Sequence, residues 1–407
     1  MLGSFVVLAK DTGQKIFREN VKSLKVWNPD NFLAPPILNL NSNDRLIVSF
    51  DILSDSPEYL RYRLIHCNSD WQPSGLLENE FLGGFNETSI EDFAFSENTY
   101  VHFINYQISL PDPALPILKS GNYLIQVYPE DSPDDILLQE RFYVSEDITN
   151  ISASASAKTD KGYLSDWQQL DLQLSLSHIP QINPYQDLEI VVSQNNRPES
   201  VRHIKHPSRV QSGVAVFEHS DDLIFEAGNE FRRFETVRTD YPGMNVDSVK
   251  FKDGVWHAWL RKDLPRDDKN YFFDKTQNGR FKIDEYNSTD PDLGADYIMV
   301  HFSLVPPDTN IREIFLQGEF TQNNLDNASL MRYAWNDGLY HADLLLKQGS
   351  YNYQYVALLD QSGQSDPSPI EGNKYETQNE YLVLVYFRPP GARADRLVSS
   401  SQFFFQP

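Results

Sequence analysis

Short runs of alternating apolar and polar residues, separated by turn-forming residues, make up most of this chain. The clearest run is Leu170–Ser177, where leucine takes every second position and polar residues fill the positions between. Side chains of a β-strand alternate between its two faces, so this run predicts a strand with one buried face. Residues 246–251 and 255–260 predict a hairpin around Asp253-Gly254. Further strand-like runs lie at 45–52, 59–66, 100–110, 123–128, 137–144, 188–193, 297–304, 340–346, 351–356 and 381–387.

Turn signals are frequent, with 24 Pro and 19 Gly, and long helical patterns are scarce. Short strands with regular turn signals are typical of antiparallel sandwiches. We therefore predict an all-β fold of tandem antiparallel β-sandwich domains, of immunoglobulin-like or early-set type.

The length of 407 residues exceeds that of one ordinary sandwich, so several domains are expected. A turn at Asp290–Gly294 is a clear boundary. We expect sandwiches over residues 21–146, 147–290 and 291–407. Residues 1–20 are expected to be a signal-peptide remnant or a disordered N-terminus.

Membrane-spanning segments are not expected. The apolar run Phe5–Leu8 is far shorter than the roughly 20 residues that a transmembrane helix needs, and no basic region precedes it. No later run approaches that length. We therefore predict no direct membrane span.

The chain is strongly acidic, with a formal net charge of −23. Phosphate-binding surfaces need clustered Lys and Arg, so nucleic acid and anionic lipid surfaces are poor partners. The favoured interpretation of the charge is solubility, and the alternative is an acidic face that docks on a basic rim. The single cysteine, Cys67, forms no intramolecular disulfide and is expected to be a buried small apolar residue.

Common catalytic motifs are absent from the sequence, and we predict no enzyme activity and no cofactor. Four aspartates within 284–296 could hold calcium, but no glycine lies where a calcium loop turns sharply, so turn and cap roles are favoured. Three histidines within 203–219 could suggest zinc, although no cysteine joins them. Surface or packing roles are favoured for these histidines, and no metal site is predicted.

Two groups of residues are candidates for contact with a partner. Trp71, Phe81 and Phe85 lie around a glycine-bearing loop, either as exposed interface anchors or as a secondary core beneath the loop. The second group is a small basic motif near the C-terminus, which either pairs with other domains or docks on an acidic partner. Its members are Arg388, Arg393 and Arg396.

Three stretches together resemble the plug protein family of the type IX secretion system of Bacteroidetes. They are His-Cys-Asn-Ser-Asp-Trp-Gln-Pro-Ser at 66–74 with Phe-Leu-Gly-Gly-Phe-Asn at 81–86, Asp-Pro-Asp-Leu-Gly-Ala-Asp-Tyr-Ile-Met-Val-His-Phe at 290–302, and Gly-Ser-Tyr-Asn-Tyr-Gln-Tyr-Val at 349–356 with 387–397. The resemblance extends over about residues 21–397. It implies a non-catalytic periplasmic protein, held at the outer membrane by a large β-barrel translocon whose periplasmic end it closes. It implies no particular site residue.

The last predicted domain also resembles, more weakly, the sandwich of family-48 carbohydrate-binding modules, through residues 315–320 and 349–356. Those modules stack sugars on a Trp shortly after the first strand, but here residues 321–325 read Thr-Gln-Asn-Asn-Leu. The alternative function is therefore a carbohydrate-binding accessory protein that acts through the C-terminal sandwich.

Overall fold

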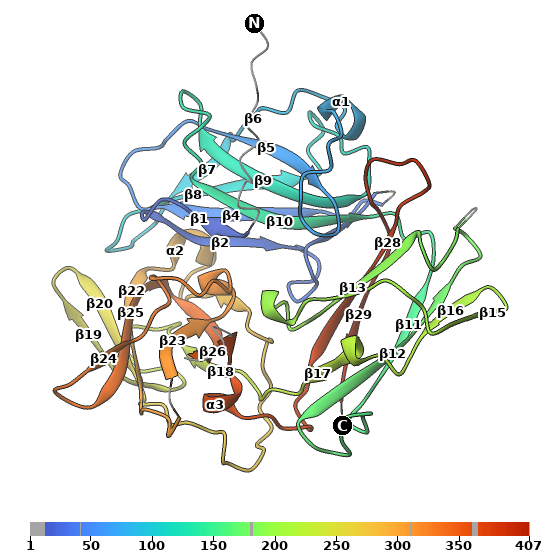
Figure 1. The fold of residues 1–407 in the computed structure, drawn as a ribbon. Coiled ribbons are helices and arrows are strands. Elements are labelled where there is room, and N and C mark those ends of the chain that lie inside the picture. Colours follow the sequence, from blue (N-terminus) through green and yellow to red (C-terminus); the bar gives the residue numbers. More distant parts are fainter. Residues whose placement is uncertain (1–12, 41, 180–181, 310, 360–364, 407) are drawn as a thin grey trace, which may run out of the picture.

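The computed structural model describes residues 13–406 except 41, 180–181, 310 and 360–364. The described residues form six β-sheets that pair into three sandwiches, and their helical elements are only three or four residues long (Figure 1). The all-β sandwich prediction is confirmed. Within these described ranges, no helix has the length and apolar character needed to cross a membrane.

The first sandwich lies at the top of Figure 1 and buries one continuous apolar core between its two sheets. One sheet has the order β1 (Lys15–Ile16), β10 (Leu138–Ser145), β9 (Gly121–Pro129), β5 (Leu60–Cys67) and β6 (Thr88–Ser89), with β3 (Ile37–Asn39) parallel to β10. The other has the order β2 (Val21–Trp27), β4 (Leu46–Ile52), β8 (Ile104–Leu110) and β7 (Asp92–Phe95). The helix α1 (Glu78–Phe81) covers one end of the core.

The middle sandwich is built from two separate parts of the chain. Its first sheet contains β11 (Ile151–Ser156), β12 (Trp167–Ser175), β16 (Val214–Phe217) and β15 (Arg209–Gln211), with β17 (Ile224–Glu226) beside β12. Its second sheet has the order β14 (Arg202–Ile204), β13 (Leu188–Gln194), β28 (Glu380–Phe387) and β29 (Arg396–Phe404). The turns η1 (Pro198–Ser200) and η2 (Asp221–Leu223) connect these strands. The alternating run from Leu170 behaves as predicted, since Leu170, Leu172 and Leu174 are fully buried.

The third sandwich is inserted between these two parts. One sheet joins β18 (Arg232–Glu235), β26 (Gly349–Leu359) and β21 (Phe281–Ile283), with β23 (Ile311–Gln317) and β27 (Ser365–Asp366) also on β26. The other has the order β19 (Val246–Lys252), β20 (Val255–Leu260), β22 (Tyr297–Leu304), β25 (Leu339–Lys347) and β24 (Arg332–Ala334). The short elements α2 (Pro291–Gly294), η3 (Glu319–Thr321) and α3 (Ser368–Glu371) lie in its connections.

The sheets do not follow the division predicted at residue 290. The hairpin β19–β20 pairs in parallel with β22, through Trp256 and Ile298, although the prediction separated them. In turn β28 pairs with β13 of the middle sandwich, through Val385 and Ile190. Local alternation identifies a strand but not its neighbour, and the neighbour is set by long-range burial.

The predicted N-terminal remnant also needs correction where the structure describes it. Lys15 and Ile16 pair with Gln139 and Leu138 of β10, so they belong to the first sandwich. Residues 1–12 of that prediction lie outside the described part of the chain.

Candidate functional site

The loop that carries Trp71 lies at the junction of the first and middle sandwiches, with Ser69 buried and Asp70 and Gln72 exposed. Ser69 donates from its backbone to Asp395 (3.0 Å) and from its hydroxyl to Glu189 (2.5 Å). Trp71 has a left-handed backbone (φ +64°), and its ring centroid lies 5.3 Å from that of Tyr143 and 4.2 Å from the guanidinium of Arg141. The most distinctive loop of the sequence is therefore largely a domain joint, with Trp71 half-buried in it.

Phe81 and Phe85 have opposite environments although they are four residues apart. Phe81 is 4% exposed and packs against His66 and Tyr123, which corresponds to the second of the two roles expected for it, a core position beneath the loop rather than an exposed partner anchor. Its place at the end of α1 turns the ring into the core of the first sandwich. Phe85 is 94% exposed and remains a candidate for partner contact.

The loop that presents Phe85 is held firmly. The Asn86 side chain accepts a hydrogen bond from the Leu64 amide and donates one to the Leu64 carbonyl, both at 2.8 Å. The Gly83 amide donates to the Pro116 carbonyl (2.8 Å). A Cβ at Gly84 would collide with the Ala114 carbonyl oxygen, so the loop can approach its neighbour only because it lacks a side chain there. The backbone that carries the exposed Phe85 ring is therefore held in one position.

The three arginines of the C-terminal basic motif all have acidic partners within the chain. Arg388 pairs with Asp395 at 2.7 Å, beside the Trp71 loop. Arg393 pairs with Glu80 of α1, and Arg396 pairs with Glu146 at 2.5 Å. Two of the three ion pairs thus join the middle sandwich to the first sandwich or to the segment that leaves it. Arg393 and Arg396 are thus engaged in domain contacts, the first of the two roles expected for the motif, whereas Arg388 pairs within its own loop.

The first and inserted sandwiches meet through a buried ion pair. Lys347 donates to Asp51 at 2.6 Å, and the two side chains are 1% and 0% exposed. Asp51 also accepts from the Tyr297 hydroxyl (2.7 Å) and from Asn105 (2.8 Å). The Lys347 ammonium lies 3.9 Å from the ring centroid of Phe103. Each polar group of this contact therefore has a partner.

The aspartate-rich segment considered for calcium serves this same contact. Asp296 accepts hydrogen bonds from the backbone amides of Tyr100 and Val101, at 2.9 and 3.0 Å. Asp290 caps α2 by accepting from the Asp292 amide. Burial raises the pKa of Asp292 above its ordinary value. These carboxylates cap and join elements, as the sequence pattern favoured.

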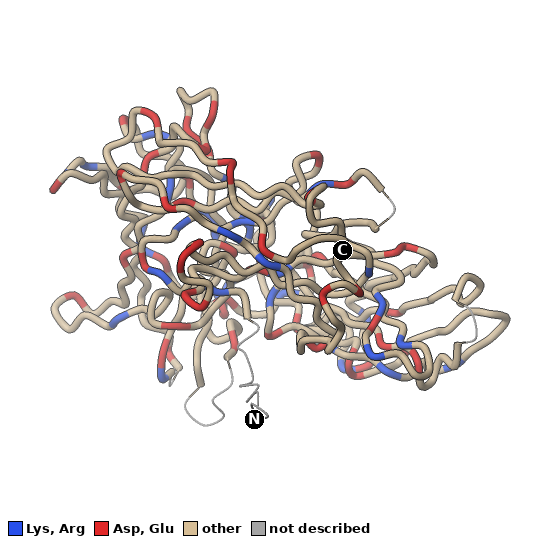
Figure 2. Tube along the Cα trace, turned by 90° about the horizontal axis from the view of Figure 1, so that it is seen from above, with Lys and Arg blue, Asp and Glu red and all other residues tan. Residues whose placement is uncertain are grey.

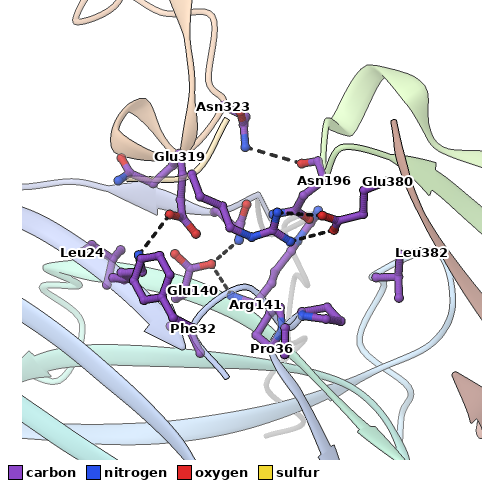
Figure 3. A pocket seen from close by; sticks show the side chains of 17 residues that line it. Leu24, Phe32, Pro36, Glu140, Arg141, Asn196, Glu319, Asn323, Glu380 and Leu382 are labelled. Atoms are coloured by element: carbon purple, nitrogen blue, oxygen red, sulfur yellow. Dashed lines mark hydrogen bonds and ion pairs between the residues drawn. The ribbon is translucent and has the colours of Figure 1, made fainter. Parts of the chain in front are cut away.

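A small polar cavity lies where the three sandwiches meet (Figure 3). Its volume of about 40 Å³ is enough for a few water molecules. Arg280 of the inserted domain forms a bidentate ion pair with Glu380 of the middle domain, in which two guanidinium nitrogens donate to the two carboxylate oxygens at 2.6 and 2.8 Å. Burial raises the pKa of Glu140 to about 7 and lowers that of Lys25 to about 8. The cavity is a joint between domains with strongly desolvated charges.

Metal chemistry finds no support in the described residues, where no group of three or more His, Cys, Asp or Glu is arranged to hold an ion. The three histidines considered for zinc have separate partners. His203 contacts Glu189, His206 contacts the Tyr185 carbonyl, and His219 contacts Asp160.

Acidic residues are spread along the whole trace, with basic residues between them (Figure 2). Along the chain, positions with acidic residues therefore alternate with positions that carry basic ones.

Comparison with known proteins identifies the family. Residues 21–146 match the family model described as "Type 9 secretion system plug protein 1st domain". The crystal structure of a hypothetical protein from Parabacteroides merdae has 37% sequence identity and a TM-score of 0.94, over 97% of this chain and 99% of that chain.

Two further results carry no information about function. A serine-rich repeat adhesion glycoprotein from Streptococcus agalactiae aligns over 95% of this chain and 97% of its own, but with 8% identity and a TM-score of only 0.13. No curated protein matches the chain. On the family match and the full-length relative, this chain belongs to the type IX secretion system plug protein family.

Proposed function

We propose that this protein is a non-catalytic plug that binds and seals the periplasmic end of the outer-membrane translocon barrel of type IX secretion. The observation that carries the proposal is the match of residues 21–146 to the plug family. Under this proposal the protein is periplasmic and attached to the outer membrane only through the translocon. Its family is not one of enzymes, which supports a role by binding alone.

The joints between the sandwiches support this role, because a seal has to keep its shape against a wide opening. The first and inserted domains share the buried Asp51–Lys347 pair, and the inserted and middle domains share the buried Arg280–Glu380 pair. The first and middle domains share a small apolar core of their own around Tyr386, whose hydroxyl donates to Asn122 at 2.6 Å. Small domain motions that separate these partners while the groups stay buried would leave uncompensated charges, which is costly. The three sandwiches are expected to act as one rigid body.

The test uses tagged protein and outer membranes from cells that express the translocon, with membranes from cells that lack the barrel as the control. Saturable retention on the first membranes only, with one very large β-barrel cross-linked to the protein, would support the proposal. A second readout is entry of an antibiotic too large for ordinary porins into cells without the plug gene. Equal retention on both membranes would refute the proposal, and so would cells that still exclude the antibiotic without the plug gene.

A carbohydrate-binding role has one observation in its favour. Trp335, just after β24 of the inserted domain, is 90% exposed, and its ring lies 4.9 Å from that of Tyr333. Exposed indole faces are common sugar-stacking surfaces, and this one comes ten residues after Leu325, the position at which the resembling modules carry their Trp. Retardation of the wild type, but not of Trp335→Ala, in polysaccharide affinity gels would support this second role. If no glycan in a panel retards the wild type, the carbohydrate-binding role is refuted.

A further inference from the structure

An apolar pocket of about 270 Å³ opens on the first sandwich, between β3, the end of β10 and the loop 111–117. Leu38, Leu40, Ile117 and Val144 contribute to its lining, together with prolines of the loop. The volume is below the roughly 300–1,000 Å³ of most small-molecule sites. It suits one or two side chains of a protein partner better than a whole ligand.

The loop that carries Phe85 lies against one wall of the pocket. The loop that ends in Phe85 runs beside 111–117, through a β-bridge between Leu82 and Ile117 and the hydrogen bond from Gly83 to Pro116. Leu118, which follows this wall, is 48% exposed. An apolar pocket and an exposed aromatic ring are therefore carried by two adjoining loops that are hydrogen-bonded to each other.

Carboxylates border the hollow. Asp112 lines it directly. Asp44 and Asp147 both bind Asn39 of the lining, the first through the Asn39 backbone amide (3.3 Å) and the second through the Asn39 side-chain amide (2.9 Å). An apolar hollow with a negative rim favours a partner segment in which basic residues flank a large apolar side chain.

We propose that this surface, defined by the pocket, its carboxylate rim and Phe85, docks an extended peptide segment of the translocon. A bulky apolar side chain of that segment fills the pocket, and neighbouring Lys or Arg residues face Asp44, Asp112 and Asp147. Phe85 packs against the same segment. The inference rests on the proposed plug function and names the contact that this function needs.

The experiment measures retention of the full chain on translocon-containing membranes for two variants with matched controls. Phe85→Ala should weaken retention about tenfold or more, because it removes a central aromatic anchor. Its control is Phe272→Ala, which removes a ring that is 81% exposed on the inserted domain and should change nothing. Asp44→Lys should slow association several-fold and flatten its salt dependence, whereas Asp131→Lys, in an exposed turn of the same domain, should not.

Each result has a separate meaning. If the wild type binds and both Phe85→Ala and Asp44→Lys bind equally well, the proposed docking surface is refuted while the plug function still stands. Wild type that does not bind refutes the plug function itself. Concentration-dependent dimers that Phe85→Ala abolishes would assign the surface to a second copy and overturn the proposal. As a direct probe, a capped Lys-Leu-Lys-Phe-Lys peptide should compete for retention and its Glu-Leu-Glu-Phe-Glu counterpart should not, and equal competition would contradict the rim's role.

Discussion

Replacing Lys347 by Met tests whether the buried ion pair fixes the inserted domain to the first. Met has a similar length and no charge, so the change removes the ammonium without opening a large cavity. Asp51 then stays buried with only two neutral donors, the Tyr297 hydroxyl and the Asn105 amide. The interaction of the ammonium with the Phe103 ring and with the Asp292 carbonyl is lost as well.

Removing one partner of a buried pair typically costs about 3–5 kcal/mol, because an uncompensated charge remains. The two remaining donors to Asp51 place the expected loss of unfolding free energy near 3 kcal/mol at neutral pH.

The assay is equilibrium unfolding in urea, followed by Trp fluorescence and by far-UV circular dichroism. The matched control is Lys252→Met, because Lys252 pairs with Asp253 while 67% exposed. Such surface pairs contribute little, so the control should unfold like the wild type. A loss below about 1 kcal/mol for Lys347→Met would refute the view that this pair locks the two domains.

Three further predictions concern buried groups at other sites. Glu140 has a pKa raised to about 7 in the folded state, so the stability it contributes is complete below pH 4.5 and is lost as the pH rises to 7. Glu140→Gln should therefore unfold like the wild type at pH 4.5 but be more stable by about 3 kcal/mol at pH 8, and equal stability at pH 8 would contradict the shift. Arg280→Met should leave Glu380 buried without its partner and lower the melting temperature, whereas an unchanged melting curve would show that the pair is dispensable. The Cys67 thiol is buried and its pKa is raised to about 12, so a thiol-reactive disulfide reagent should label it only after unfolding, and fast labelling of native protein would show the burial to be wrong.

Elements and family were the most predictable features. The run from Leu170 to Leu174 identified β12, and Asp253-Gly254 identified the hairpin of β19 and β20. These features depend on neighbouring residues, because the two-residue period of a strand and the backbone of a tight turn are local properties. The residues that resemble the plug family extend over most of the chain, so the order of amino acids is enough to indicate the family.

The sequence by itself thus determined that the chain is a series of β-sandwiches with no long helix, and which family it resembles. Only the tertiary structure decided that β28 and β29 complete the middle sandwich rather than the last one, and that Phe81 is core while Phe85 is surface. It alone revealed the pairing of Asp51 with Lys347, which lie 296 residues apart. The strand partners, the burial of each ring and this ion pair depend on which distant surfaces bury each other and which charges are desolvated together. The spacing of residues along a short segment does not determine either of these.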